Sequence, residues 1–370
     1  MDKIKESNKE TITRSPVRVG ISIGDVNGIG PEVIMKALND TRLLLDCTPI
    51  IYGSSKVFSF HKENLDIKEF VFLNSDSVDG VRDKNINVVN IWKDEIKFEL
   101  GKATSDGGRL AFESLEAATS DLASGKIDVL VTAPISKDAM SQSGFKFPGH
   151  TEYLADMSGE AEALMLMVAP SLRLGLVTSH IPLKDVTTTL TADKVYDKIK
   201  SFAASLTKDF GIRRPKIAVF GVNPHAGESG KMGTEELESI IPGINKAKNE
   251  EIIAFGPFPA DGFFGSSAQQ NYDGVLAMYH DQGLAAFKAL SFDEGVNFTA
   301  GLPIIRTSPD HGTAYDIVGQ DKASGASMRN AIYMAIDVFW NHQLEKEITA
   351  NPLEMQKRVD FRKDKRKETE

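Results

Sequence analysis

The distribution of apolar and polar positions predicts strands that alternate with helices along most of the chain. Short apolar runs typical of strands occupy residues 18–24, 48–54, 127–135, 172–180, 216–225 and 274–281. Apolar residues recur at helical spacing over residues 31–40, 107–126, 192–207, 234–249 and 323–344. This alternation favours an α/β fold with a largely parallel sheet.

Local signals support several of these boundaries. Pro31 stands where the first helix begins, and Gly125 follows the last periodic residue of the second helix. The run IDVLVTAPI is apolar without alternation, as expected of a strand that is covered on both faces. The apolar run GLPII predicts another strand, from whose end Arg306 emerges.

Composition restricts the class of protein. The chain has 370 residues, enough for two domains, with 41% apolar and 26% charged residues and a net charge of -9, which argues against nucleic-acid binding. With Cys47 as the single cysteine, any metal must be held by His, Asp or Glu. The polar N-terminus and the lack of a long apolar run predict a cytoplasmic protein. Residues 1–15 are predicted to be a disordered lead-in, and the mixed-charge run at 357–370 a solvated, poorly ordered end.

Three of the predicted strands end in histidine: His180, His225 and His280. Ligands of parallel α/β sheets bind beyond the carboxyl ends of strands, so three imidazoles there can share a divalent metal and leave open coordination positions. Each histidine alone is more commonly a helix cap or a satisfied polar residue, but their shared position favours the metal site. Asp261 and Asp281 are candidate additional ligands or partners of the ligands, with turn aspartates as the alternative.

A second group of residues suits an anion. His150 and Thr151 follow a glycine and precede a helical pattern, so Thr151 is predicted to cap a helix whose N-terminus binds an anion. Lys288 and Arg306 are candidate cations, and Asn297 lies between them in the sequence. An ordinary helix cap and surface cations are the alternatives.

Two glycine-containing segments raise the question of nucleotide binding. GDVNGIGPE, residues 24–32, does not match the dinucleotide or phosphate-loop fingerprints and is interpreted as a tight strand-to-helix turn. TSPDHGTAYDIVG, residues 307–319, is predicted to be an irregular loop, in which Asp310 and His311 can hydrogen-bond a ribose or an adenine edge.

Several long motifs resemble those of the 4-hydroxythreonine-4-phosphate dehydrogenase family, which includes dehydrogenases of 4-phosphorylated threonate and erythronate. They are GDVNGIGPE, GHTEYLA, TSHIPLKDV, GVNPHAGESGKMGTEE, PADGFF, MYHDQGLAAFK and IRTSPDHGTAYDIVG, spread over residues 17–345. Val26 and Asn27 depart from the family's usual first motif. The resemblance implies an isocitrate/isopropylmalate dehydrogenase-like α/β/α fold with an active site between two domains. These would be residues 16–140 with 295–345, and residues 141–294, followed by a charged tail at 346–370.

The resemblance also implies roles for individual residues. His180, His225 and His280 would bind a divalent metal at the interface of a homodimer, with ligands drawn from both subunits; zinc is expected, with magnesium, manganese or cobalt as alternatives. His150, Thr151, Lys288, Asn297 and Arg306 would bind a phosphorylated hydroxy-acid substrate. Asp310, His311, Gly312, Thr313 and Ala314 would bind NAD, with NADP as the alternative.

The implied reaction is oxidation of the 3-hydroxyl of 4-(phosphooxy)-L-threonine followed by decarboxylation, in pyridoxal 5'-phosphate biosynthesis. Asp261, Asp281 and Lys288 remain alternatives for the general base. The rival hypotheses are a 4-phosphothreonate or 4-phosphoerythronate dehydrogenase of sugar-acid catabolism, a metal-dependent hydrolase or lyase without NAD, and a non-catalytic binding module.

Overall fold

The computed structural model describes residues 15–65, 67, 69–159 and 163–352. The predicted lead-in before residue 15 and the mixed-charge run at 357–370 lie outside these residues. The predicted tail begins too early, because the last helix continues to Thr349. In the described part of the chain, no helix is both long and apolar enough to cross a membrane.

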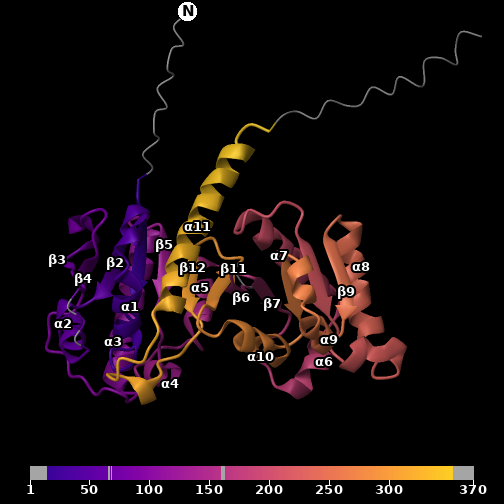
Figure 1. The fold of residues 1–370 in the computed structure, drawn as a ribbon, viewed down its shortest axis with the longest axis horizontal. Coiled ribbons are helices and arrows are strands. Elements are labelled where there is room, and N and C mark those ends of the chain that lie inside the picture. The colour runs from indigo at the N-terminus through magenta and orange to yellow at the C-terminus, as the bar shows by residue number, and fades with distance from the viewer. Residues whose placement is uncertain (1–14, 66, 68, 160–162, 353–370) are drawn as a thin grey trace, which may run out of the picture.

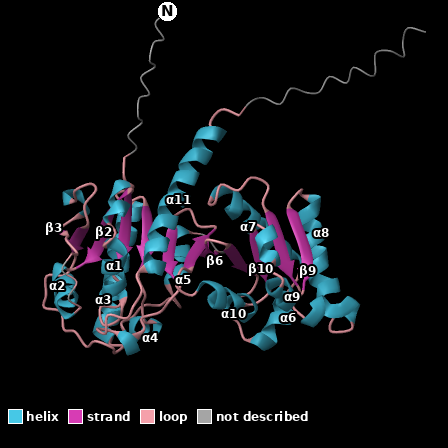
Figure 2. Ribbon diagram, in the orientation of Figure 1, coloured by secondary structure: helices cyan, strands magenta, loops and turns pink. Residues whose placement is uncertain are grey.

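The described residues form one sheet of 12 strands with helices on both of its faces (Figure 1; Figure 2). In sheet order the strands are β3 (Leu73–Ser75), β4 (Asn87–Asn90), β2 (Cys47–Gly53), β1 (Val17–Ser22), β5 (Val129–Thr132), β12 (Arg306–Pro309), β11 (Val296–Ala300), β6 (Leu164–Ala169), β7 (Leu172–Leu176), β10 (Gly274–Ala277), β8 (Lys216–Phe220) and β9 (Ile253–Phe258).

Each helix predicted from the sequence is present, but the one expected over residues 234–249 is divided into a π-helix (Glu236–Ile240) and a shorter α-helix, and five other helices were not predicted. The described part of the chain contains eleven α-helices. They are α1 (Gly30–Leu38), α2 (Ser55–Asn64), α3 (Ser105–Ala123), α4 (Lys137–Gln142), α5 (His150–Ser158), α6 (Val186–Thr189), α7 (Ala192–Lys208), α8 (Ile241–Asn249), α9 (Ala260–Gly265), α10 (His280–Ser291) and α11 (Ala326–Thr349). Pro31 stands in the first turn of α1, and Gly125 has a φ of 71° just after α3, as the sequence predicted.

The sheet consists of two parallel halves joined by antiparallel strands. β1 to β5 and β12 run in one direction, whereas β7, β8, β9 and β10 run in the other, and β11 and β6 reverse the direction between them. Five steps separate β5 from β10. At roughly 20–25° of twist per step, the halves are turned strongly relative to one another. α4, α9 and α10, which follow β5, β9 and β10, therefore all lie on the lower side of Figure 1.

The core is continuous on one face of the sheet and divided on the other. Val129 and Val131 of β5 belong to a core that extends beneath α1, α7 and α11 and spans both halves. Leu130 points to the other face, into a separate core with α3 and α5. A third core, around α9 and α10, covers that face in the other half. This division leaves space at the middle of the sheet.

The strand prediction was wrong around Arg306. Residues 301–305 form a loop whose apolar side chains Leu302 and Ile305 are buried, and Arg306 begins β12 instead of following a strand. The antiparallel joining strands were also absent from the prediction of a largely parallel sheet.

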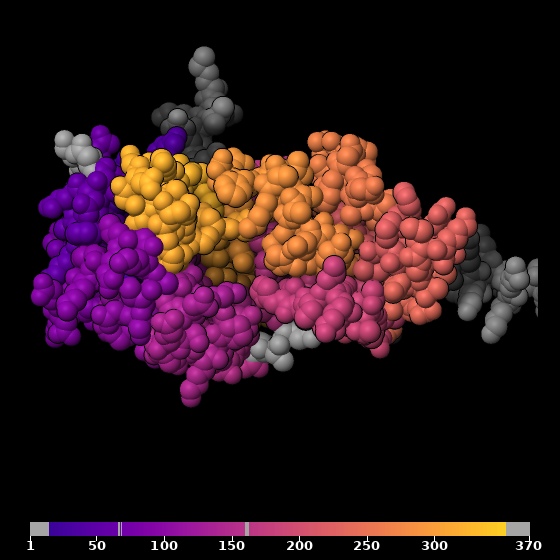
Figure 3. All heavy atoms as spheres, turned by 90° about the horizontal axis from the view of Figure 1, so that it is seen from below, coloured from indigo at the N-terminus to yellow at the C-terminus, as the bar shows by residue number. Residues whose placement is uncertain are grey.

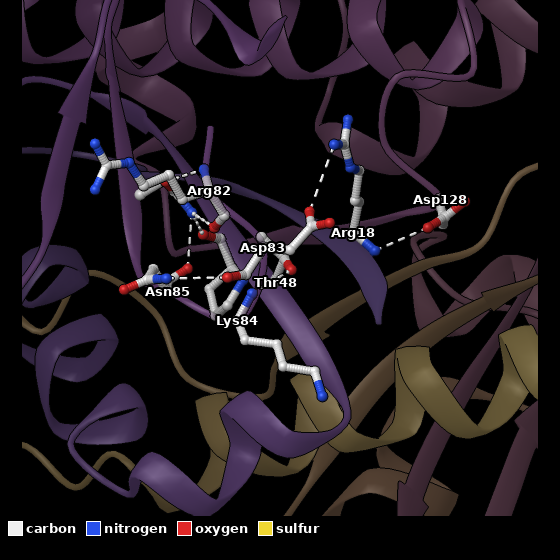
Figure 4. Close-up of polar contacts among 9 residues, drawn as sticks. Arg18, Thr48, Arg82, Asp83, Lys84, Asn85 and Asp128 are labelled. Atoms are coloured by element: carbon white, nitrogen blue, oxygen red, sulfur yellow. Dashed lines mark hydrogen bonds and ion pairs between the residues drawn. The ribbon is translucent and has the colours of Figure 1, made fainter. Parts of the chain in front are cut away.

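Polar contacts at the amino ends of β1 and β2 are shown in Figure 4. The Arg18 backbone N–H donates to Asp128 at 2.8 Å, its guanidinium approaches Asp83 at 3.5 Å, and the Lys84 backbone N–H donates to Thr48 at 2.9 Å. The Arg18 and Asp83 side chains are well exposed, so their ion pair contributes little stability. These contacts fix the loop at residues 82–85 at the amino ends of the strands, whereas the candidate site lies at their carboxyl ends.

Candidate active site

A cavity of about 530 Å³ lies at the middle of the sheet, between the two divided cores. The carboxyl end of β5 contributes Thr132, and the segment after β7 contributes His180. Figure 3 views the molecule from the side of these strand ends, where segments from early, middle and late parts of the chain meet. The predicted residues in its lining are His150, Thr151, His180, Asn297, Arg306, Asp310, His311 and Gly312.

Arg306 is the central cation of this cavity. It is 3% exposed, and its guanidinium donates to Thr132 at 3.1 and 2.6 Å and to Thr299 at 3.2 Å. Burial lowers the pKa of Arg306 to about 10, so the side chain stays charged at neutral pH. The neutral hydroxyl groups of Thr132 and Thr299 orient this charge, and the carboxylate of Glu152, which also lines the cavity, acts on it from nearby. An anionic ligand in the cavity would add a further counter-ion for the guanidinium.

His150 extends the same donor surface. Arg306 Nη2 lies 3.3 Å from His150 Nδ1, and because a guanidinium only donates, Nδ1 accepts and the ring proton lies on Nε2. Burial, and then the charges of Arg306 and Lys137, hold the pKa of His150 well below its usual range. Nε2 is buried without a partner among the described residues, so a neutral imidazole offers an unused N–H donor to the cavity.

Two acceptors complete the lining. Asn297 Oδ1 and His311 Nε2 are both buried and have no partner in the described part of the chain. His311 Nδ1 donates to the carbonyl of Gly312 at 3.2 Å, and burial lowers the pKa of His311, which leaves Nε2 with a free lone pair. Lys288, which was predicted to bind the substrate, is not part of the cavity lining, but its Nζ lies 3.5 Å from Oδ1 of Asp310, which is. Burial raises the pKa of Asp310.

The turn after β1 supports the loop at residues 307–319. The carbonyl of Thr313 accepts from the Ile29 backbone N–H at 3.0 Å, and the Tyr315 hydroxyl donates to Asp25 at 2.5 Å. Asn27 joins this turn to the segment before α3 through Thr104 at 3.0 Å. The first motif is therefore a strand-to-helix turn, as predicted, and it also acts as the anchor of the predicted cofactor loop.

His180 and His280 are the two predicted metal ligands that the single chain brings together. Their ring centres are 6.0 Å apart. Two imidazoles bound at about 2.0–2.1 Å to one ion have ring centres roughly 5–6 Å apart, so this spacing fits a shared metal. Asp281 accepts from His280 Nδ1 at 2.7 Å, so the proton of the neutral ring lies on Nδ1 and the lone pair of Nε2 is available to bind a metal. Burial, and then Lys137, lower the pKa of His180, which favours the neutral ligand form.

His225 is not part of this pair. It is exposed, within the segment Pro224–Gly230 that follows β8. Among the described residues of one chain, no group of three His, Cys, Asp or Glu side chains is placed to hold a metal ion. Asp261 is exposed at the start of α9 and is also absent from the cavity lining. The predicted three-histidine site is thus not assembled within one chain.

The structure corrects one predicted role and adds residues that the sequence analysis missed. Gly149, not Thr151, is the N-cap of α5, and no side chain caps this helix. Thr132, Lys137 and Glu152 line the cavity, and all lie beyond strand ends or inside a motif already noted. The rule of strand carboxyl ends could have identified Thr132 and Lys137, and Glu152 directly follows His150 and Thr151 in a motif that the sequence analysis had already singled out.

The fold and the cavity are those of an α/β protein whose site, between two halves of a sheet, is suited to an anionic small molecule. Comparison with known proteins narrows this class. Residues 45–335 match the family described as pyridoxal phosphate biosynthetic protein PdxA. A 4-hydroxythreonine-4-phosphate dehydrogenase from Bacteroides thetaiotaomicron is 48% identical over 342 residues, covering 92% of this chain and 93% of that protein.

Other relatives give a consistent assignment. A putative D-threonate 4-phosphate dehydrogenase from Oceanobacillus iheyensis is 37% identical over 88% of this chain and 99% of its own length. The crystal structure of a 4-hydroxythreonine-4-phosphate dehydrogenase from Klebsiella pneumoniae superposes with a TM-score of 0.76 at 33% identity, covering 89% of this chain and 99% of that one. The chain therefore belongs to the PdxA family, and the α/β fold predicted from the sequence is confirmed.

Family membership makes the chain a dehydrogenase, so the hydrolase and binding-module hypotheses are set aside. A dehydrogenase uses a nicotinamide cofactor, and metal dependence is general in this family.

Proposed function

We propose that this chain oxidises the 3-hydroxyl of 4-(phosphooxy)-L-threonine with NAD, and that loss of carbon dioxide then gives 3-amino-2-oxopropyl phosphate, in pyridoxal 5'-phosphate biosynthesis. The family match and the 48% identical relative support this substrate. The observation that carries the proposal is the joint presence, in one cavity, of the buried charge of Arg306 and the unused Nε2–H of His150.

The side chains in the cavity would bind and orient the substrate. Arg306 and His150 hold an anionic group, with the positive charge of Lys137 nearby. Asn297 Oδ1 is an acceptor suited to a substrate hydroxyl or ammonium group. Fixing a phosphate or carboxylate at one end leaves the carbon that carries the 3-hydroxyl in a defined position, which is the main contribution of such residues to rate.

His180, His280 and His225 would hold the divalent metal, for which zinc is the first choice because imidazoles are its favoured nitrogen ligands. When bound, the metal would act as a Lewis acid that lowers the pKa of the substrate hydroxyl and stabilises negative charge during decarboxylation. Because one chain pairs His180 with His280 and leaves His225 apart, we propose a homodimer in which the two subunits share each metal site. The exposed side chains of Ile181 and Leu183, close to His180 in sequence, suit such an interface.

Asp310, His311, Gly312, Thr313 and Ala314 would contact NAD, with NADP as the alternative. The cofactor would supply the hydride acceptor, and the chain's part is to fix the loop through Tyr315 and Asp25. Lys288 has the best position of the three candidate bases, because its partner Asp310 lines the cavity, whereas Asp281 is bonded to His280. We further propose a cytoplasmic location.

The second candidate function is oxidation of D-threonate 4-phosphate or its erythronate isomer. It is retained because a relative with this activity in its name is 37% identical over 88% of the chain. These substrates carry the same phosphate, carboxylate and 3-hydroxyl but lack the 2-amino group, so the same cavity can bind them.

The test is formation of reduced nicotinamide by the purified, metal-loaded full-length protein, with 4-(phosphooxy)-L-threonine and D-threonate 4-phosphate offered separately. We expect kcat/KM to favour the amino acid by a factor of about 10² or more, the discrimination expected when a site pairs a substrate polar group. A preference for the threonate would replace the first function by the second. Inactivity with both, in protein that binds NAD, would refute both.

A further inference from the structure

The segment that carries His225 has an unusual backbone. Five consecutive residues, His225 to Ser229, have positive φ angles of 53°, 50°, 77°, 42° and 58°. Their ψ angles lie between -7° and 51°, so the segment forms a turn of left-handed helix. Only glycine visits this region at low cost, and other residues do so mostly as single residues. Here the single glycine of the five is Gly227.

Such a turn persists only when surrounding contacts determine it. Glu236 supplies those contacts. It is 2% exposed, and its Oε1 accepts from the backbone N–H groups of Val222 and Asn223, both at 2.8 Å, while Oε2 accepts from Asn223 Nδ2 at 3.0 Å. The carboxylate thus fixes the residues immediately before the left-handed turn.

Glu236 also packs against the turn itself. A Cβ atom placed on Gly227 would lie 2.5 Å from Glu236 Oε2, and one placed on Gly221 would lie 2.8 Å from Ala226 Cα. There is no room for either. The buried carboxylate and the left-handed turn are therefore in direct contact, and a change in one must move the other.

We propose that Glu236 is a positioning residue: it clamps the left-handed turn and so sets the place of the His225 imidazole for metal binding. This inference rests on the proposed function, in which His225 is a metal ligand. His225 itself is exposed, and among the described residues its side chain makes no hydrogen bond or ion pair, so the backbone of the turn is the main determinant of its position. Strained backbone that is held by a buried charge is characteristic of sites where geometry matters more than stability.

The test measures metal binding by the full-length, metal-free protein with Co²⁺ as the probe, from both the dissociation constant and the visible absorption bands of the bound ion. The variants are Glu236→Gln and Gly227→Ala. Glu236→Gln keeps one acceptor oxygen but places a donor against Asn223. Gly227→Ala keeps the carboxylate but adds a methyl group to the turn, where it would press against Glu236 Oε2. Glu238→Gln is the matched control, because Glu238 is exposed in the same segment. His225→Ala reports whether His225 is a ligand at all.

We expect Glu236→Gln and Gly227→Ala to weaken Co²⁺ binding by about 10–100-fold and to change the absorption bands, as for other residues that orient metal ligands. Glu238→Gln should match the original protein. The thermal midpoint of each metal-free variant checks folding, and Gly227→Ala serves if Glu236→Gln does not fold. If both folded variants keep the original affinity and bands while His225→Ala loses them, the inference is overturned and the proposed metal site stands. If His225→Ala also keeps them, the proposed metal site fails as well.

Discussion

Arg306 donates to His150 Nδ1 at 3.3 Å, and this contact decides the chemistry that both side chains offer to the cavity. The guanidinium fixes the imidazole as the tautomer with its proton on Nε2, the atom that lacks a partner in the described residues. A permanent charge and a neutral donor therefore act together. The pair can bind a phosphate or carboxylate without changing its own protonation near neutral pH.

Arg306→Lys should weaken substrate binding. Lysine keeps a positive charge but cannot reproduce the fork that bonds Thr132, Thr299 and His150. We expect kcat/KM for the phosphorylated substrate to fall by about 10²-fold, with the loss mainly in KM, because contacts to a buried charge are worth about 2–5 kcal/mol. Steady-state kinetics measures this. Arg109→Lys, on the exposed face of α3, is the matched control and should change neither constant. An unchanged KM in Arg306→Lys would exclude Arg306 as the anion-binding residue.

Asp281→Ala should weaken metal binding without destabilising the metal-free protein. The Asp281 side chain is 85% exposed, yet it accepts from His280 Nδ1 and so orients that ring. Loss of such a partner typically costs about 10–100-fold in metal affinity. Titration of the metal-free protein with Zn²⁺ measures the effect, and thermal melting checks the fold. Asp261→Ala separates the two predicted aspartates: if it, and not Asp281→Ala, reduces affinity, Asp261 is the residue that serves the metal.

Tyr315→Phe should affect NAD more than the substrate. The change removes the hydroxyl that joins the loop at residues 307–319 to Asp25, and it leaves a buried carboxyl with one partner fewer. We expect KM for NAD to rise roughly 10-fold while KM for the substrate stays constant, and the free energy of unfolding to fall by about 1–3 kcal/mol. Tyr333→Phe on α11 is the control. Equal changes in both KM values would show that the loop does not serve the cofactor alone.

Much of the fold could be predicted because its signals are local. Continuous apolar runs such as β5 and helical periodicity such as that of α7 each record their own environment. Thr151 shows the limit of local rules: it has the right residue type for a cap, but the N-cap of α5 is Gly149, two residues earlier. Likewise, Leu302 and Ile305 are apolar side chains that are buried although they lie in a loop. An apolar run in the sequence therefore cannot by itself distinguish a buried loop from a strand.

The candidate site was less predictable because it is built by long-range contacts. Arg306 meets Thr132, 174 residues away, and His150, 156 residues away, through the pairing of β12 with β5. No periodicity along the chain records that pairing. The three histidines were visible as strand ends, but strand ends alone do not show that the single chain pairs only His180 with His280.

His61→Gln should make stability less sensitive to acid. His61 is 2% exposed, its Nε2 donates to the carbonyl of Val26 at 3.1 Å, and burial lowers its pKa to about 4. In the unfolded chain this pKa is about 6.5, so the unfolded state binds the proton first as the pH falls. The stability that the neutral His61 imidazole contributes is therefore complete above about pH 6.5 and is lost towards about pH 4, at up to about 1.4 kcal/mol per pH unit.

In the variant, the glutamine side chain can still donate to the carbonyl of Val26 but does not titrate. Urea unfolding at a series of pH values gives the free energy of unfolding as a function of pH. Between about pH 6.5 and pH 4 this free energy should fall by about 3 kcal/mol less in the variant than in the original protein. Above pH 7 the two curves should be parallel. Identical slopes in the acid range would mean that His61 is protonated in the folded protein.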